Sequence, residues 1–281
     1  MMEYQVSSTS MIMMSVALVA GVVIPVVLFL VLHFRMKCKV VPFFVGCATF
    51  FLFACVLEQV LHMVVLTLSP TGERMMGNIW LYGLYGALAA GVFEETGRFL
   101  AMKYVLKKYH DTDCNALMYG AGHGGFEVLY VLGLGMLSNL VLAFTINSGL
   151  LETQLAVLSG ETYDQTVAAV EALCTTGAYI FGVGIAERFI AVAFHMAISV
   201  VVWLAATRGG KFVLFYPLAI FLHFLFDLVA VIFNSYFGIW VTEFALLVIA
   251  ALFAFAVRAL YRRYCVNGIA GEDAVRMKRR D

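Results

Sequence analysis

Long apolar segments, separated by short polar connections, follow one another along the whole chain. Each is near or above the roughly 20 residues that a helix needs to cross the hydrocarbon of a bilayer. Seven can be drawn, at residues 11–34, 41–68, 79–105, 115–147, 177–206, 212–234 and 237–261. The pattern predicts an all-α fold, a polytopic transmembrane helical bundle of about seven spans. We expect residues 1–281 to form a single integral membrane domain, without room for a second soluble one.

Composition supports a membrane protein. Hydrophobic residues make up 63% of the chain and charged residues 13%, against roughly 25% charged residues in ordinary soluble domains. The mean hydropathy is +0.94. The net charge of +0 gives no argument for a nucleic-acid partner, and we expect none. The first ten residues lack a basic region, and the apolar run after them is too long for a cleaved signal peptide, so we expect a retained first helix.

The basic residues are distributed unevenly between the two sides of the predicted bundle. Alternate connections carry 15 of the 18 Lys and Arg residues, whereas Arg74 alone lies in a connection on the other side. The connection 148–176 is acidic and has no Lys or Arg. Cytoplasmic loops of membrane proteins are enriched in Lys and Arg. We therefore predict an N-terminus outside the cell and a C-terminus in the cytoplasm.

Ionisable residues lie inside several of the apolar segments. The pair Glu94-Glu95, followed by Arg98, is the clearest case, because a charge at the bilayer centre costs at least about 2.5–3.5 kcal/mol unless it is paired, hydrated or functional. Later segments add His123, Glu127, Glu187, Arg188, His195, His223 and Asp227. From a rise of about 1.5 Å per residue, Glu94, His123, His195 and His223 lie roughly 12–17 Å from the cytoplasmic ends of their helices. This common depth predicts one shared site within a four-helix core at about 79–234.

The two glutamates differ in direction. They point about 100° apart on a helix, so only one can face a cavity squarely, while Arg98 is within reach of both. A glutamate in such a position has the chemistry of a general base that activates water. The alternative is a structural ion pair that ties helices together.

Three histidines lie at similar depth, and each has a polar residue four positions after it. This arrangement favours one shared site over isolated interhelical hydrogen bonds. The pairs are His123 with Glu127 and His223 with Asp227. Imidazoles and carboxylates are ligands that zinc accepts. We name His123, His195 and His223 as candidate Zn²⁺ ligands, which with Glu127 or Asp227 could supply three or four ligands. Since no His-Glu-x-x-His motif is present, the residues leave both a metal site and a metal-free glutamate mechanism open.

Four motifs carry a resemblance to a known family. They are Glu94-Glu95-x-x-Arg98, then His123-x-x-x-Glu127, then Glu187-Arg188 with His195-x-x-x-Ser199, and finally His223-x-x-x-Asp227. In this order they resemble the motifs of the YhfC-like intramembrane proteases, which look like relatives of the PrsW-type proteases and the type II CAAX prenyl endopeptidases. The PrsW-type pattern has Phe where this chain has His123.

The resemblance implies particular roles. It implies that the first motif supplies the catalytic glutamate and that the late His and Asp residues surround the water and the oxyanion. Members of the family are often described as metalloproteases. It also implies a multi-pass protein of the bacterial cytoplasmic membrane.

The resulting prediction is an intramembrane endopeptidase, of glutamic or metalloprotease type, acting on membrane-embedded or membrane-associated proteins or peptides. Its predicted catalytic residues are Glu94, Glu95, Arg98, His123, Glu127, His195, His223 and Asp227. A proton-coupled transporter would also cluster such residues near the midplane. A catalytically silent immunity or binding protein on the same scaffold is a third interpretation. Neither the substrate nor the oligomeric state follows from the sequence.

Overall fold

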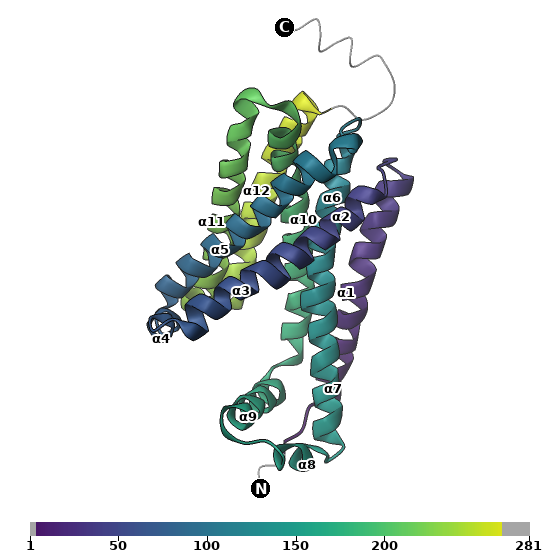
Figure 1. Ribbon diagram of the computed structural model, residues 1–281. Helices are drawn as coiled ribbons and strands as arrows, with labels where there is room; N and C mark the ends of the chain where they lie inside the picture. The colour runs from purple at the N-terminus through teal and green to yellow at the C-terminus, as the bar shows by residue number, and fades with distance from the viewer. Residues whose placement is uncertain (1–3, 266–281) are drawn as a thin grey trace, which may run out of the picture. The chain divides into compact units, whose positions relative to one another are not determined.

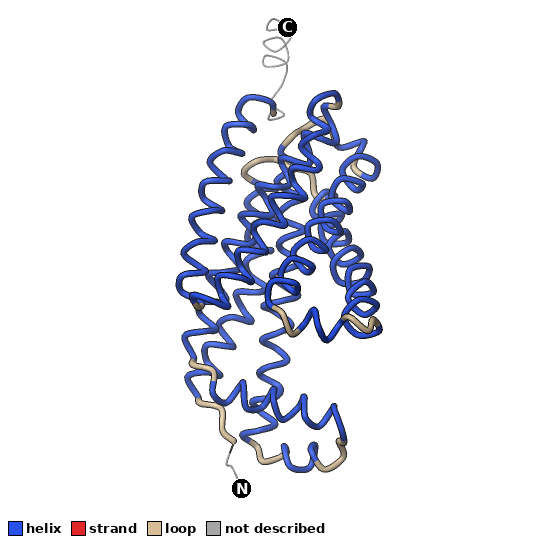
Figure 2. The backbone as a smooth tube through the Cα atoms, turned by 90° about the vertical axis from the view of Figure 1, so that its left-hand side faces the viewer, coloured by secondary structure: helices blue, strands red, loops and turns tan. Residues whose placement is uncertain are grey.

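A computed structural model describes residues 4–265, and every regular element in this part of the chain is a helix (Figure 1). In the tube drawing, accordingly, no described residue is coloured as a strand (Figure 2). The basic residues of the predicted cytoplasmic tail, at 276 and 278–280, lie outside the described residues.

Most of the predicted segments are continuous helical runs, some with π-helical turns inside them. In chain order the elements are α1 (Ser8–Phe34), α2 (Val41–Phe50), η1 (Phe51–Glu58), α3 (Gln59–His62), η2 (Met63–Leu68), α4 (Gly72–Met76), α5 (Ile79–Leu100), η3 (Ala101–Val105), η4 (Lys107–Tyr109), α6 (Cys114–Val128), η5 (Leu129–Leu134), α7 (Gly135–Asn147), α8 (Leu151–Leu155), α9 (Gly160–Thr175), α10 (Ala178–Arg208), η6 (Gly210–Leu214), α11 (Phe215–Phe237) and α12 (Ile239–Tyr264). The predicted all-α fold is confirmed.

Among the described residues, 6 helical runs are long and apolar enough to cross a membrane. They are Ser8–Phe34, Val41–Leu68, Cys114–Asn147, Ala178–Arg208, Gly210–Phe237 and Ile239–Tyr264. The remaining predicted span, 79–105, is also helical throughout, as α5 and η3. It is less apolar because Glu94, Glu95 and Arg98 fall within it. A seventh crossing, and the orientation of the termini, therefore stay predictions.

The chain divides into two compact units. Unit 1 comprises Met1–Val26 and Glu127–Phe189, and unit 2 comprises Val27–Phe126 and Ile190–Asp281. The expectation of a single membrane domain with a core at about 79–234 stays a prediction.

Unit 1 has its own apolar core, in which Met14, Ala143 and Val170 are fully buried. Its N-terminal segment is fastened to the end of α7, because the amide of Asn147 bonds both the N–H and the carbonyl of Val6, each at 2.9 Å.

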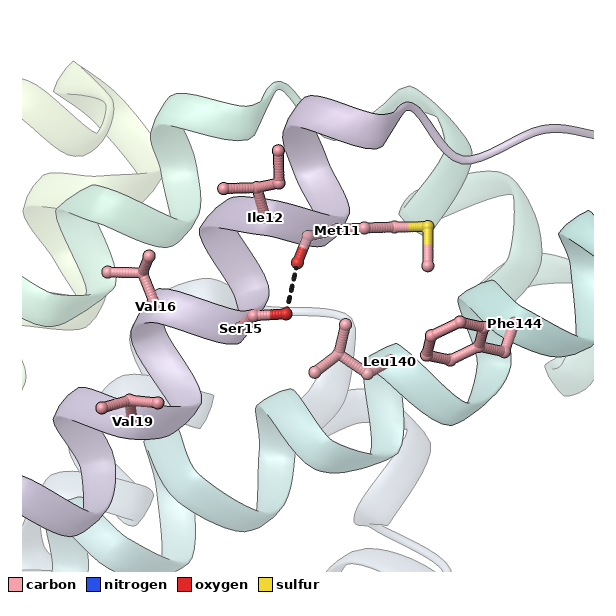
Figure 3. A pocket seen from close by; sticks show the side chains of 7 residues that line it. All are labelled: Met11, Ile12, Ser15, Val16, Val19, Leu140 and Phe144. Atoms are coloured by element: carbon pink, nitrogen blue, oxygen red, sulfur yellow. Dashed lines mark hydrogen bonds between the residues drawn. The ribbon is translucent and has the colours of Figure 1, made fainter.

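A pocket of about 440 Å³ lies in unit 1, along α1 and α7 (Figure 3). Its lining is apolar apart from Ser15, whose Oγ donates to the carbonyl of Met11 at 2.8 Å in its own helix. The pocket therefore offers no acid, base or metal ligand.

Unit 2 is built on close helix contacts made by glycines. A Cβ on Gly91 of α5 would lie 2.8 Å from the carbonyl oxygen of Ile220 in α11, and one on Gly122 of α6 would lie 1.9 Å from the carbonyl oxygen of Phe43 in α2. Small residues let membrane helices approach this closely. These contacts fix the helices that carry the polar residues described next.

Candidate active site

Helix α5 carries the three charged residues into the interior of unit 2. It begins after Asn78, whose Oδ1 accepts hydrogen bonds from the N–H groups of Trp80 and Leu81, as an N-cap side chain does. Fifteen residues into the helix, the exposed fraction is 8% for Glu94 and 0% for both Glu95 and Arg98. Buried charges require partners, and each of the three has them.

Glu94 faces two histidines. Its Oε2 lies 2.9 Å from Nε2 of His123 on α6, and 4.0 Å from Nδ1 of His195 on α10. The two imidazole rings are themselves adjacent, with centroids 5.2 Å apart. Three helices thus bring one carboxylate and two imidazoles together.

Glu95 contacts a different set of side chains. Oε2 accepts a hydrogen bond from Nε of Arg98 at 2.9 Å, and Oε1 lies 2.8 Å from Nδ1 of His223 on α11. The other ring nitrogen of His223, Nε2, lies 3.4 Å from Oδ2 of Asp227. Both carboxylate oxygens of Glu95 and both ring nitrogens of His223 are therefore engaged.

Arg98 joins the two groups. In addition to its bond to Glu95, it donates from Nη1 to Oγ of Ser199 at 2.5 Å and from Nη2 to Nδ1 of His195 at 3.1 Å. Since guanidinium has only donors, Nδ1 of His195 must be the acceptor. The sequence analysis did not include Ser199 among the predicted catalytic residues. The signals for it were its position four residues after His195 and its place in the motif His195-x-x-x-Ser199.

Glu127 makes a different contact. It lies in unit 1, where its Oε1 accepts a hydrogen bond from Nη1 of Arg188 at 2.5 Å, and Nη2 of the same Arg188 bonds Glu187. Both glutamates of this group therefore pair with the same Arg188. The catalytic role predicted for Glu127 stays a prediction.

A second polar group in unit 2 joins the run α2–η2 to α5. His62 bonds Glu58 through Nε2 at 3.1 Å and the hydroxyl of Tyr85 through Nδ1 at 2.9 Å. The contacts are those of an interhelical hydrogen-bond group.

Glu94, His123 and His195 form the group of possible metal ligands in the described part of the chain, with ligand atoms within 4.8 Å of one another. Two imidazoles and one carboxylate are a ligand set of catalytic zinc sites, which leave a fourth position for water. His123 and His195 were two of the three predicted ligands. The third, His223, contacts Glu95 and Asp227 and is not in this group, so its role as a ligand stays a prediction.

Two details of the geometry bear on whether a metal fits. Oε2 of Glu94 and Nε2 of His123, at 2.9 Å, are near the separation of about 3.3 Å expected for two ligands on a tetrahedral zinc with bonds of about 2.0–2.1 Å. Nδ1 of His123 is buried and, among residues 4–265, has no hydrogen-bond partner, which costs about 1–3 kcal/mol. Nδ1 lies on the other side of the ring from Nε2, so a metal bound through Nε2 would leave this cost in place. Binding through Nδ1 of His195 would require Nη2 of Arg98 to give way. With that one exchange, the residues fit a zinc ion.

The sequence also matches a known protein family. The family model described as YhfC intramembrane metalloprotease matches residues 20–250. The chain belongs to the YhfC family.

A relative within this YhfC group is the uncharacterized membrane protein YhfC of Bacillus subtilis (strain 168), which is 39% identical over 213 residues. The alignment covers 75% of this chain and 80% of that protein. No solved structure gives a significant match. With six long apolar helical runs among residues 4–265, this YhfC family member is a multi-pass membrane protein. The relation to PrsW-type and CAAX proteases stays a prediction.

Proposed function

We propose that this YhfC family member is an intramembrane endopeptidase that hydrolyses peptide bonds of membrane-embedded or membrane-associated proteins, with Glu94 as the carboxylate that acts on the attacking water. The observation that carries the proposal is the buried contact of Glu94 with His123 and His195. A carboxylate and two imidazoles within reach of one point are the groups that such a hydrolysis needs.

The contacts of the two glutamates favour Glu94 over Glu95 as the base. Glu95 has both oxygens bound, one by Arg98 and one by His223, so accepting a proton from water would break a buried pair. Glu94 is slightly exposed, and its Oε2 lies 2.9 Å from Nε2 of His123 and 4.0 Å from Nδ1 of His195. In this scheme Glu94 accepts the proton of the water, and His123, bonded to it through Nε2, holds the carboxylate in place.

Arg98 and His223 have supporting parts in the same scheme. Arg98 fixes the ring of His195 through Nδ1 and holds Glu95. His223 reaches Asp227 over the longer of its two contacts, 3.4 Å. Opening that contact would free an N–H to stabilise the oxyanion of the tetrahedral intermediate.

A zinc ion fits the same three side chains. If one is bound, Glu94, His123 and His195 would hold it, and it would supply a Lewis acid for the water and the scissile carbonyl. Both forms of the proposal depend on Glu94, so its loss must stop hydrolysis in either.

The test is a cleavage assay of the purified protein in lipid against a panel of single-span membrane proteins, with metal content measured on the same sample. Glu94→Gln keeps the size of the side chain and should abolish cleavage. Asp113→Asn, which alters another buried carboxylate in unit 2 that bonds Trp203 and Arg208, is the matched control and should retain it. A folded wild type that cleaves no substrate, or a Glu94→Gln variant that cleaves normally, would overturn the proposal.

A further inference from the structure

Two cysteines of unit 2 lie together, outside the candidate active site. Cys38 is in the connection between α1 and α2, and Cys114 is the first residue of α6. Both are buried, with exposed fractions of 1% and 2%, in one apolar cluster with Leu32 and Met118. The neighbouring thiol of Cys114 and burial together raise the pKa of Cys38.

The residues that follow the two cysteines are also bonded to each other. The N–H of Lys39 donates to Oδ1 of Asn115 at 2.9 Å, and Nζ of Lys39 pairs with Oδ2 of Asp111 at 2.5 Å. Lys37 has the left-handed φ of 59°, which turns the chain so that Cys38 points back into the cluster. The backbones at the two cysteines are therefore held near each other by contacts that do not involve sulfur.

We propose that Cys38 and Cys114 form a reversible disulfide, a redox-sensitive modification site that joins the α1–α2 connection to the start of α6. A disulfide requires neighbouring backbones at a Cα separation of about 4.4–6.8 Å. The bond between Lys39 and Asn115 on the adjacent residues favours that spacing. This proposal does not rest on the proposed proteolytic function.

The two thiols have different parts in the oxidation. Cys114 begins a helix, and its Sγ accepts a hydrogen bond from Oγ1 of Thr112 at 3.7 Å. Both a helix N-terminus and a hydroxyl donor stabilise a thiolate. With a hydroperoxide as oxidant, the thiolate of Cys114 attacks oxygen and gives a sulfenic acid and water. The sulfur of Cys38 then displaces hydroxide, which takes up the thiol proton as a second water. The two thiols lose two electrons and the peroxide gains them.

The disulfide would fix the start of α6, the helix that carries His123, to the α1–α2 connection. That residue lies nine positions after Cys114 in α6, a helix rise of about 13.5 Å. On the predicted topology both cysteines face the cytoplasm, where thiols are kept reduced and disulfides are transient and redox-sensing. The dithiol is thus the resting state and the disulfide the response to oxidant.

The test counts thiols on the full-length protein in lipid, before and after hydrogen peroxide, by labelling with a maleimide-polyethylene glycol after denaturation. The chain has 6 cysteines, so wild type should take up that number of labels, lose two on oxidation and regain them with dithiothreitol. In the Cys38→Ala and Cys114→Ala variants, oxidation should remove no labels that dithiothreitol then restores. Cys47→Ala is the matched control, and should still lose two.

Peptide mass spectrometry on oxidised wild type identifies the linked cysteines without any variant, so the test survives if a variant fails to fold. A peptide joining Cys38 to Cys114 supports the proposal. Retention of every thiol by wild type, a link between other cysteines, or a reversible loss that persists in Cys38→Ala would overturn it.

Discussion

Arg98 on α5 donates from Nη1 to Oγ of Ser199 on α10 at 2.5 Å, inside the protein where both side chains are fully buried. The hydroxyl of Ser199 donates onward to the carbonyl of His195 at 2.7 Å. One serine thus positions the guanidinium that holds both Glu95 and the ring of His195. This links α5 to α10 at the candidate active site.

Ser199→Ala should lower kcat while leaving the fold and the metal content unchanged. The variant removes an acceptor from a buried charge, a bond that contributes about 1.5–3 kcal/mol, and so loosens Arg98 and His195. Cleavage kinetics and metal analysis measure the two effects. Ser15→Ala is the control, because that hydroxyl bonds only within α1 (Figure 3). Equal kcat in Ser199→Ala and wild type would contradict a positioning role.

The three histidines should differ in their effect on bound metal. His123→Ala and His195→Ala each remove a ligand, so zinc content measured by mass spectrometry of the purified protein should fall in both. His223→Ala should keep its zinc, because His223 is held by Glu95 and Asp227, yet it should lose activity. Loss of zinc from His223→Ala as well would instead favour the three-histidine site predicted from the sequence. A fully active wild type free of metal would leave only the glutamate mechanism.

Arg98→Lys should raise the affinity for zinc. Nη2 of Arg98 donates a hydrogen bond to Nδ1 of His195, so that nitrogen is not free to bind a metal. Lysine keeps the positive charge opposite Glu95 but lacks the planar guanidinium that reaches both Glu95 and His195. Competition of the purified protein with a zinc chelator should show roughly tenfold tighter binding, which corresponds to about 1.4 kcal/mol. Unchanged or weaker binding would show that Arg98 does not compete with the metal.

Alanine at a glycine in a close helix contact should lower stability and activity, whereas alanine at a glycine with open space beside it should not. A Cβ on Gly122 would lie 1.9 Å from a backbone oxygen of α2, whereas one on Gly86 of α5 would meet nothing within 4 Å. Gly122→Ala should therefore force α6 from α2, displace His123 and lower both thermal stability and activity. Gly86→Ala should be close to neutral. Thermal unfolding in detergent checks both, and a stable, active Gly122→Ala would contradict this packing.

Fusions of a reporter after Lys39, Lys108 and Lys211 should report the cytoplasm, and fusions within 148–176 the exterior. The reason is the distribution of 15 basic residues on one set of connections and Arg74 alone on the other. In the structure the 148–176 segment holds α8 and α9. A cytoplasmic signal from this segment would overturn the seven-span topology and the common depth of the polar residues.

The helical fold and the choice of polar residues could be read from the sequence. Runs of apolar residues of about 20 or more leave a helix as the one structure that satisfies its own backbone in lipid. The depth of Glu94, His123, His195 and His223 follows from the fixed rise of a helix. That is why residues far apart along the chain could be assigned to one site.

The partners of each polar residue were decided only by the tertiary structure. The sequence shows that Glu94 and Glu95 point in different directions, but not that Glu94 meets His123 while Glu95 meets Arg98 and His223. It also left Ser199 out of the predicted catalytic residues, whereas the structure bonds Ser199 to Arg98. It did not show that Glu127 bonds Arg188. The physical reason is that these contacts depend on the rotation of each helix about its own axis. That rotation is set by how glycines such as Gly91 and Gly122 pack against the backbone of neighbouring helices, and the spacing of residues within one helix does not contain it.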